Sequence, residues 1–175
     1  MLQLVTRSDP SRSLPEDFRA AMRQLPGGVS VITAGRDAAR TGLTATSVVS
    51  FSADPPTLLV CVNKTASALP IMRRDGCFGV SVLAATQQDV ADRFAGRDGV
   101  KGAARYEGAT WRTLETGVWL LEGALANFDC EIDEIIERHS HAIVIGRVCA
   151  ASSGEGGGLV HWRRAYRQIS ESGAE

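Results

Sequence analysis

The segment Gly42–Ser67 constrains the fold more than any other part of this chain, because it encodes two consecutive strands joined by a tight turn. Asp54-Pro55-Pro56 forces that turn, since each proline fixes its own φ angle and biases the preceding residue toward extended conformations. The apolar run Thr57–Val62 then predicts a buried strand. Strands joined this closely pair in the antiparallel sense, so the segment predicts a β-rich fold.

Small polar side chains flank both of these strands. Thr44, Thr46, Ser47 and Ser50 surround the first strand, and Asn63, Lys64, Thr65 and Ser67 follow the second. Free backbone N–H groups at the start of a short helix, together with hydroxyls and one ammonium, favour a phosphate. Helix capping and ordinary strand chemistry explain either loop equally well when it is taken alone. Together the two loops favour a polar ring system that ends in a phosphate, such as a flavin.

The other predicted elements are mostly strands that follow one another directly. A capping box at Ser13–Glu16 predicts the start of a helix that places Phe18, Met22 and Leu25 on one face. Strands are predicted at 29–34, 76–83, 119–135 and 141–151, short helices at 69–72 and from residue 86, a loop at 96–108, and a closing element at 159–166. This order predicts a mainly β, antiparallel barrel with peripheral helices rather than an alternating βαβ sheet.

Length and charge narrow the class of protein. The 175 residues predict one domain at 13–170, preceded by a flexible lead-in at 1–12. The net charge of −1 gives no electrostatic footprint for nucleic acid, and no apolar run approaches the roughly 20 residues of a membrane span. The first residues lack the pattern of a signal peptide, so we expect a cytoplasmic protein.

The common nucleotide and hydrolase motifs are absent from the sequence. No G-x-G-x-x-G follows a strand, and neither G-x-x-x-x-G-K-[ST] nor G-x-S-x-G is present. The four cysteines form no C-x-x-C and are predicted to be buried, reduced thiols: Cys61, Cys77, Cys130 and Cys149. The acidic run Glu131–Glu134 is predicted to be solvated surface rather than a catalytic carboxylate pair.

Two histidines and two aromatic residues are further candidates. His139 and His141 would share one face if both lay on a strand, but no suitable further ligands follow, so no metal site is predicted. His141 instead lies where a loop enters an apolar strand, where it can orient a charged cosubstrate. Trp162 is expected to pack in the core; alternatively, Trp162 and Tyr166 form a wall of a ring-binding cleft.

Several motifs in order and spacing resemble a known family. They are FRAAMRQLPGGVSVITA, the segment Gly42–Ser67, FGVSVL, Phe94-Ala95-Gly96, Arg105-Tyr106 ahead of Trp111, His141 ahead of IVIGRV, and LVHWRRAY. On these motifs the chain resembles the short-chain flavin reductases of the FMN-binding split-barrel family. These are the small components of two-component, flavin-dependent aromatic monooxygenases.

The resemblance implies an antiparallel split barrel of Greek-key type and an NAD(P)H:flavin oxidoreductase. Hydride would pass from NADH or NADPH to FMN or FAD, and reduced flavin would go to a partner monooxygenase. A homodimer is also implied. A non-enzymatic flavin-binding or flavin-carrier protein on the same barrel is the alternative.

The resemblance also implies roles for individual residues. Thr44, Ala45, Thr46 and Ser47 would line the isoalloxazine, Val62, Asn63, Lys64 and Ser67 the ribityl chain and phosphate, and Phe94, Ala95 and Gly96 the flavin edge. His141 would contact the nicotinamide, and Ser50 and Tyr166 complete the predicted cofactor-binding set. The chain departs from the family at His139, which replaces a glycine, and at His161, which replaces an aromatic residue.

Overall fold

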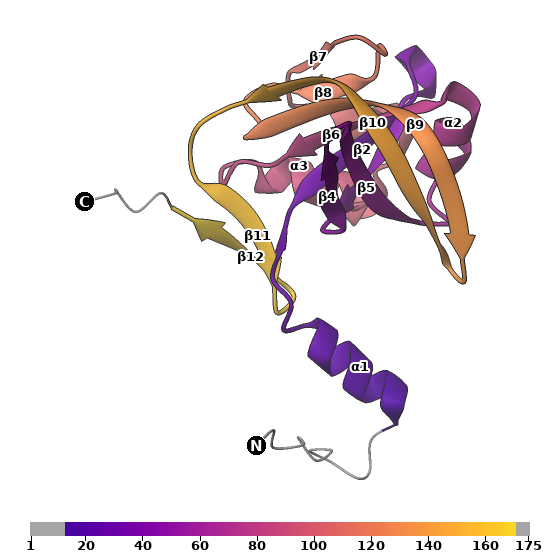
Figure 1. Cartoon of the computed structure of the whole chain (residues 1–175). Helices are drawn as coiled ribbons and strands as arrows, with labels where there is room; N and C mark the ends of the chain where they lie inside the picture. The colour runs from indigo at the N-terminus through magenta and orange to yellow at the C-terminus, as the bar shows by residue number, and fades with distance from the viewer. Residues whose placement is uncertain (1–12, 171–175) are drawn as a thin grey trace.

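The computed structural model describes residues 13–170, which form a β-rich body with short helices around it (Figure 1). The helices are α1 (Leu14–Met22), α2 (Ala68–Asp75) and α3 (Gln88–Phe94), with 3₁₀ turns at Asp37–Ala39, Arg97–Gly99 and Gly102–Tyr106. The strands are β1 (Gly27–Gly28), β2 (Ser30–Ala34), β3 (Thr41–Ala45), β4 (Val48–Ala53), β5 (Pro56–Asn63), β6 (Cys77–Val82), β7 (Trp111–Thr113), β8 (Trp119–Leu121), β9 (Ala126–Arg138), β10 (His141–Ser153), β11 (Gly158–Trp162) and β12 (Ala165–Ile169). The predicted lead-in at 1–12 lies outside the described residues.

Seven strands form the main sheet in the order β3-β2-β6-β9-β10-β5-β4, and every pair in it is antiparallel. The edge strands β3 and β4 are separated by only Thr46 and Ser47, a link that spans at most about 11 Å. The two edges must therefore meet at this link, which curls the sheet into a barrel that stays unpaired between β3 and β4. We call this place the barrel split. The predicted mainly β, antiparallel split barrel is confirmed.

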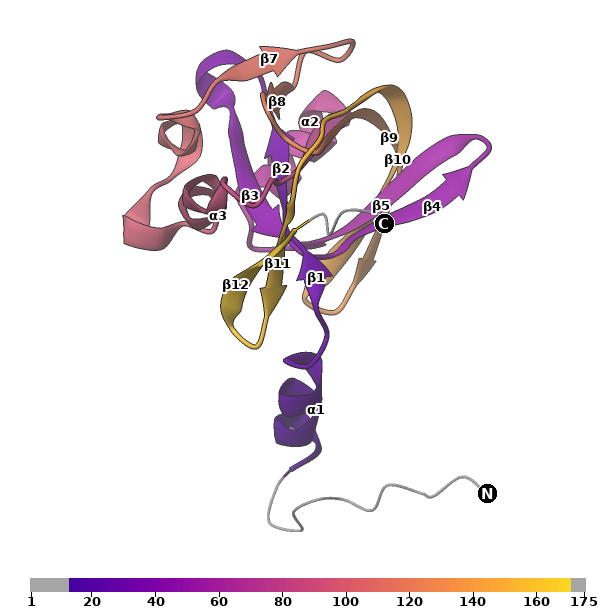
Figure 2. The same ribbon diagram turned by 90° about the vertical axis from the view of Figure 1, so that its left-hand side faces the viewer.

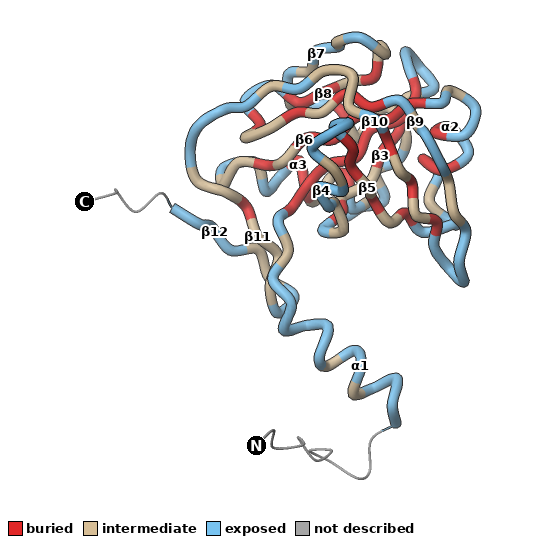
Figure 3. Tube along the Cα trace, viewed as in Figure 1, coloured by how far each residue is buried: buried red, intermediate tan, exposed pale blue. Residues whose placement is uncertain are grey.

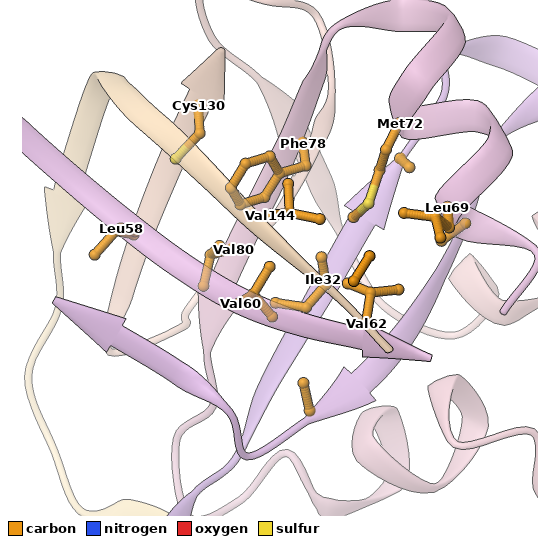
Figure 4. Packing of buried hydrophobic residues seen from close by; sticks show 14 residues of the cluster. Ile32, Leu58, Val60, Val62, Leu69, Met72, Phe78, Val80, Cys130 and Val144 are labelled. Carbon is orange, nitrogen blue, oxygen red and sulfur yellow. The ribbon is translucent and has the colours of Figure 1, made fainter. Parts of the chain in front are cut away.

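The barrel interior holds the larger of two hydrophobic clusters. Ile32, Val60, Val80 and Val144 are fully buried there, and Figure 4 shows how such side chains from several strands converge. Helix α2 closes this side by adding the buried Leu69 and Met72, and burying side chains of this size stabilises the fold by roughly 1.5–3 kcal/mol each.

A second cluster lies on the opposite face of β2. Alternation along this strand sends Ile32 into the barrel and Val31 into the second cluster, so β2 is buried on both faces. Phe94 of α3 and Tyr106 pack there edge to face, with ring centroids 5.0 Å apart. The short helix predicted from residue 86 is present as α3, with Val90, Ala91 and Phe94 buried.

Helix α1 projects away from the body, and the hairpin β11–β12 lies beside its C-terminal end (Figures 1 and 2). The predicted capping box is present, with the Ser13 backbone N–H donating to Glu16 at 2.8 Å. The predicted apolar residues cover nothing, since Phe18 is 61% and Leu25 64% exposed. Figure 3 shows that α1 is mostly exposed along its length. No helix in the described part of the chain is long and apolar enough to cross a membrane.

Three local predictions are wrong. The strand predicted at 119–135 is interrupted between β8 and β9, because Gly123 adopts a φ of +70° in a turn. Trp162 is half-buried rather than in the core; its indole Nε1 donates to the Gln24 carbonyl at 3.1 Å. Cys61 and Cys149 are also only half-buried, whereas the other two cysteines are buried as predicted, and all four are free thiols.

Candidate functional site

A cavity of about 640 Å³ opens along β3, and we call it the β3 cavity. It lies between β3, the loop that leads into α2, the end of α3 and the segment 97–106. Its wall carries four hydroxyls and three cationic side chains: Thr41, Thr44, Thr65, Ser67, Arg40, Lys101 and Arg105. Apolar side chains, including Leu43, Ile71 and Phe94, complete the lining. No acidic side chain is among the described residues that line it.

The hydroxyls of the β3 cavity are held in place by neighbouring groups. Thr41 Oγ1 and Ser67 Oγ lie 3.0 Å apart, which joins β3 to the residue that precedes α2. Thr44 Oγ1 donates to the Ala91 carbonyl of α3 at 2.6 Å, so its lone pairs remain free to accept. Ser67 is the N-cap of α2 and lies in the same wall, and the N-terminus of a helix favours an anion.

The three cations differ in how firmly they are fixed. Arg105 donates to the Gly42 carbonyl and, through Nε, to the Val100 carbonyl at 3.2 Å; burial lowers the pKa of its guanidinium. The Arg40 guanidinium lies 5.2 Å from the Tyr106 ring centroid, and its buried Nε has no hydrogen-bond partner among the described residues. Lys101 is exposed and enters none of the ion pairs found within residues 13–170. Together these cations make the cavity suited to a phosphate.

The loop after β5 behaves differently from the prediction. Asn63 Oδ1 accepts hydrogen bonds from the Thr65 backbone N–H and hydroxyl, both at 2.9 Å, so it closes its own turn. Lys64 Nζ forms an ion pair with Glu137 at 2.9 Å and does not line the β3 cavity. Lys64 and Arg73 hold the pKa of the Glu137 carboxyl below its usual range. Val62 is fully buried in the barrel core, so its side chain faces away from any ligand.

The barrel split lies beside the β3 cavity and carries the other predicted ring-binding residues. Ala45 is buried, Thr46 is exposed, and Ser47 Oγ donates to the Cys61 carbonyl at 3.0 Å. Thr46 and Ser47 line a second hollow of about 500 Å³, bounded on its far side by the hairpin β11–β12. The run Thr44–Ser47 thus passes from one recess to the other. Ser50 lies farther along β4 and lines neither recess.

His141 is the first residue of β10 and pairs directly with Asn63 on β5. Its imidazole is exposed, and Nδ1 lies 2.9 Å from the Ser140 hydroxyl. One strand separates His141 from the barrel split, a distance of about 10 Å at the usual strand spacing. His141 is therefore at the same end of the barrel as Thr46 and Ser47.

His139 lies in the turn before β10, not on a strand, so the condition under which it would share a face with His141 is not met. Its φ of +49° is in the left-handed region that favours glycine. The turn therefore keeps a glycine-like backbone despite the substitution. No group of three or more histidine, cysteine or acidic residues within 13–170 is placed to hold a metal ion.

Of the remaining predicted residues, only two line a recess. Phe94 and Ala95 line the β3 cavity, and Gly96 follows them with a φ of +78°. Tyr166 lines neither recess; it packs edge to face on His161 with centroids 5.6 Å apart, and burial raises the pKa of its phenol.

Sequence reasoning missed the cationic wall of the β3 cavity. Arg40, Lys101 and Arg105 come from two loops that carry no recognisable phosphate motif. The Arg105-Tyr106 pair could have drawn attention to this segment, because it is one of the motifs shared with the family. Its position in the sequence does not show that Arg105 lines a cavity. Tyr106 is buried and its hydroxyl donates to the Thr41 carbonyl at 2.7 Å, which anchors this loop against β3.

Comparisons with known proteins agree with this architecture. The family described as "Flavin reductase like domain" matches residues 22–170. The chain is 40% identical over 169 residues to "FMN reductase (NADH) RutF 2" of Methylorubrum extorquens, covering 96% of this chain and 97% of that one. It is 39% identical over 158 residues to "FMN reductase (NADH) RutF" of Stutzerimonas stutzeri, covering 90% of each chain.

Solved structures of flavin reductases are also similar to this chain. The flavin reductase component BorF of a bacterial two-component tryptophan halogenase superposes with a TM-score of 0.82 at 34% identity, covering 90% of this chain and 99% of that one. The NADH:FAD oxidoreductase of Streptomyces globisporus gives a TM-score of 0.81 at 30% identity, covering 96% and 99%.

Proposed function

The chain belongs to the flavin reductase-like domain family, and we propose that it is an NADH:flavin oxidoreductase with its flavin in the β3 cavity and along the barrel split. The observation that carries the assignment of the site is the cavity wall of hydroxyls and three cations without an acid, directly beside an unpaired stretch of polar backbone. Relatives named FMN reductase (NADH) support FMN and NADH as the pair.

The phosphate end of the flavin occupies the β3 cavity. Ser67, the N-cap of α2, approaches the phosphate from one side, and Lys101 and Arg105 balance its charge from the other. A neutral isoalloxazine then lies along Thr44–Ser47, where backbone and hydroxyl groups can hydrogen-bond its polar edge. This leaves one face of the ring open toward the second recess.

Bound flavin supplies the hydride acceptor at N5, for which the donor C4 must be held at close approach. The chain therefore needs to bind and orient two ring systems, and no nucleophile or general base is required. His141, exposed at the same end of the barrel as the split, orients the nicotinamide by hydrogen bonding.

The two lysines of the chain test the site of the phosphate, because the sequence favours one and the structure the other. Lys101→Gln should raise the Kd for FMN about tenfold, the value of one charge-assisted hydrogen bond. Lys64→Gln should change it less than twofold, because Glu137 already engages that ammonium. Fluorescence titration of FMN measures both. A larger effect of Lys64→Gln would put the phosphate at the loop after β5 instead.

The role of His141 has its own test. His141→Ala should raise the KM for NADH or slow flavin reduction while the Kd for oxidised FMN stays nearly unchanged, since the imidazole lies outside the β3 cavity. Stopped-flow reduction with unchanged rates and unchanged NADH dependence would remove His141 from the donor site.

We further propose that residues 13–170 act as one domain and that two copies associate through α1. A nine-residue helix with no buried side chain is not stable by itself in water, so its apolar face needs a partner. Leu14, Phe18 and Met22 on that helix and Leu25 just beyond it are exposed, and covering each contributes roughly 1.5–3 kcal/mol. Val49 and Phe51 on β4 offer a second exposed apolar surface for the other copy.

Light scattering tests this association. The wild-type chain should have twice the mass of one protomer, and Phe18→Glu should reduce it to one. The control Arg19→Glu, one residue away on the same helix, should leave the mass unchanged. A monomeric wild type would contradict the proposal.

The product, reduced flavin, goes to a separate oxygenase component in this proposal. Solved relatives are titled as flavin reductase components of two-component systems, which supports a partner that receives reduced flavin. A cytoplasmic location fits the four unpaired thiols, which are usual in a reducing compartment.

A further inference from the structure

The second recess beside the barrel split is strongly cationic, and we propose that it binds the diphosphate of the dinucleotide hydride donor. We call it the hairpin hollow. The proposal rests on the proposed function, because a donor bound in the hollow delivers its nicotinamide to the flavin ring along Thr46 and Ser47. The hollow has a volume of about 500 Å³ and lies between the segment 22–27 and the hairpin β11–β12.

The charge of the hairpin hollow has one sign. Arg23, Arg163 and Arg164 line it together with His161, and no acidic side chain is among its described lining residues. None of the three arginines takes part in the ion pairs found within residues 13–170. Three guanidinium groups left without carboxylates around one recess favour an anion that carries several oxygens, as a diphosphate does.

One of these arginines, Arg163, is held in place by its neighbours. Arg163 Nε donates to Gln24 Oε1 at 2.9 Å, and its guanidinium stacks 4.4 Å from the Trp162 ring centroid. The Trp162 indole bonds the Gln24 carbonyl, and β1 pairs with β11 through Gly27 and His161. These contacts fix both walls of the hollow relative to each other.

The backbone conformation of the hairpin turn also supports a ligand site in the hollow. Arg163 and Arg164 are the two residues between β11 and β12, and both have positive φ, +49° and +66°. Such a two-residue turn strongly favours asparagine and glycine at these positions. Two consecutive long cationic side chains in that conformation are unfavourable for folding, and strain of this kind clusters at ligand sites.

The position of the hollow separates the donor from the flavin phosphate. Thr46 and Ser47 line the hairpin hollow, whereas Thr44 lines the β3 cavity. The two anionic groups thus bind on opposite sides of the barrel split, and the two rings meet between them.

The test compares donors with and without phosphate. Arg164→Gln should raise the KM for NADH about tenfold, since one charge-assisted contact is lost, and leave kcat within about twofold. The KM for 1-benzyl-1,4-dihydronicotinamide, which has no phosphate, should not change. The matched control Arg167→Gln removes an exposed charge from the same hairpin outside the hollow and should alter neither.

A KM for NADH that is unchanged in Arg164→Gln, or an equal rise for both donors, would overturn the assignment. Calorimetric binding of ADP-ribose keeps this result separate from the proposed function. Wild-type chain that binds ADP-ribose and loses about tenfold in affinity with Arg164→Gln supports the hollow even if no flavin is reduced. A wild type that reduces flavin but binds no ADP-ribose contradicts the hollow alone.

Discussion

Gly42 packs tightly against the buried part of the sheet and also lines the β3 cavity, and there is no room for a side chain at this position. A Cβ added at this residue would lie 2.4 Å from the Ile32 carbonyl oxygen and 2.6 Å from Phe94 Cε1. Ile32 belongs to the doubly buried strand β2, and Phe94 is 1% exposed in the second cluster. Neither neighbour can move without disturbing other buried groups, so Gly42→Ala must shift the edge strand β3 or the Phe94 ring.

The size of the effect follows from these contacts. Adding carbon atoms to a well-packed core usually costs 1–3 kcal/mol. Because one of the close atoms here is backbone, we expect about 3 kcal/mol, at the upper end of that range. For a domain of this length, this corresponds to a fall in Tm of about 6–12 °C. Phe94 and Gly42 also line the β3 cavity, so FMN affinity should fall with stability.

Urea and thermal unfolding of Gly42→Ala measure the loss, and FMN titration measures the effect on the cavity. Gly28→Ala is the matched control: it also lies in a strand, but no atom is within 4 Å of its added Cβ. That variant should stay within about 1 kcal/mol of the wild type. A Gly42→Ala chain as stable as the control would refute the packing argument and with it this wall of the cavity.

Three further changes test other parts of the structure. Asn127→Ala should lower the free energy of unfolding by about 2–4 kcal/mol in a urea titration, because it leaves the buried Ser81 hydroxyl without its acceptor; a loss under 1 kcal/mol would contradict this. His139→Gly should raise the free energy of unfolding by about 1 kcal/mol, because glycine adopts the left-handed conformation of residue 139 without strain. A destabilised variant would argue against this conformation. Glu137→Gln should be less stable than wild type at pH 7, because pairing with Lys64 lowers the carboxyl pKa. That pairing stabilises above the ordinary glutamate pKa and is lost as pH falls through the lowered one, so the two curves should merge in acid; a constant difference would contradict the pairing.

The barrel could be predicted because its signals are local. Asp54-Pro55-Pro56 fixes one turn, and the strands on either side follow from short apolar runs, as β4 and β5 show. The break between β8 and β9 was missed because apolar residues resume at Ala124 and Leu125, and only Glu122 and Gly123 mark the turn.

The candidate site was harder to predict because long-range contacts build it. The sequence around Lys64 is typical of a phosphate-binding loop, yet its ammonium forms an ion pair with Glu137 near the end of β9. No local sequence pattern predicts that ion pair. Lys101 and Arg105 reach the cavity from a loop that is tied to β3 by the Tyr106 hydroxyl at Thr41 and by Arg105 itself at Gly42.

The amphipathic pattern of α1 was read correctly, but a pattern does not say what covers the apolar face. Phe18 on α1 and Leu25 just beyond its end both remain exposed, and this segment projects from the body. The sequence shows that such a face must be covered, whereas only the fold shows that the same chain does not cover it.

The most direct test of the account is NADH oxidation by the purified chain with and without added flavin, followed by the loss of NADH absorbance. We predict turnover of NADH that requires added FMN, with many equivalents of NADH consumed per protein chain. FAD and NADPH, tested in parallel, rank the alternative acceptor and donor. A chain that binds FMN but consumes no NADH with either flavin would contradict the assignment as a flavin reductase.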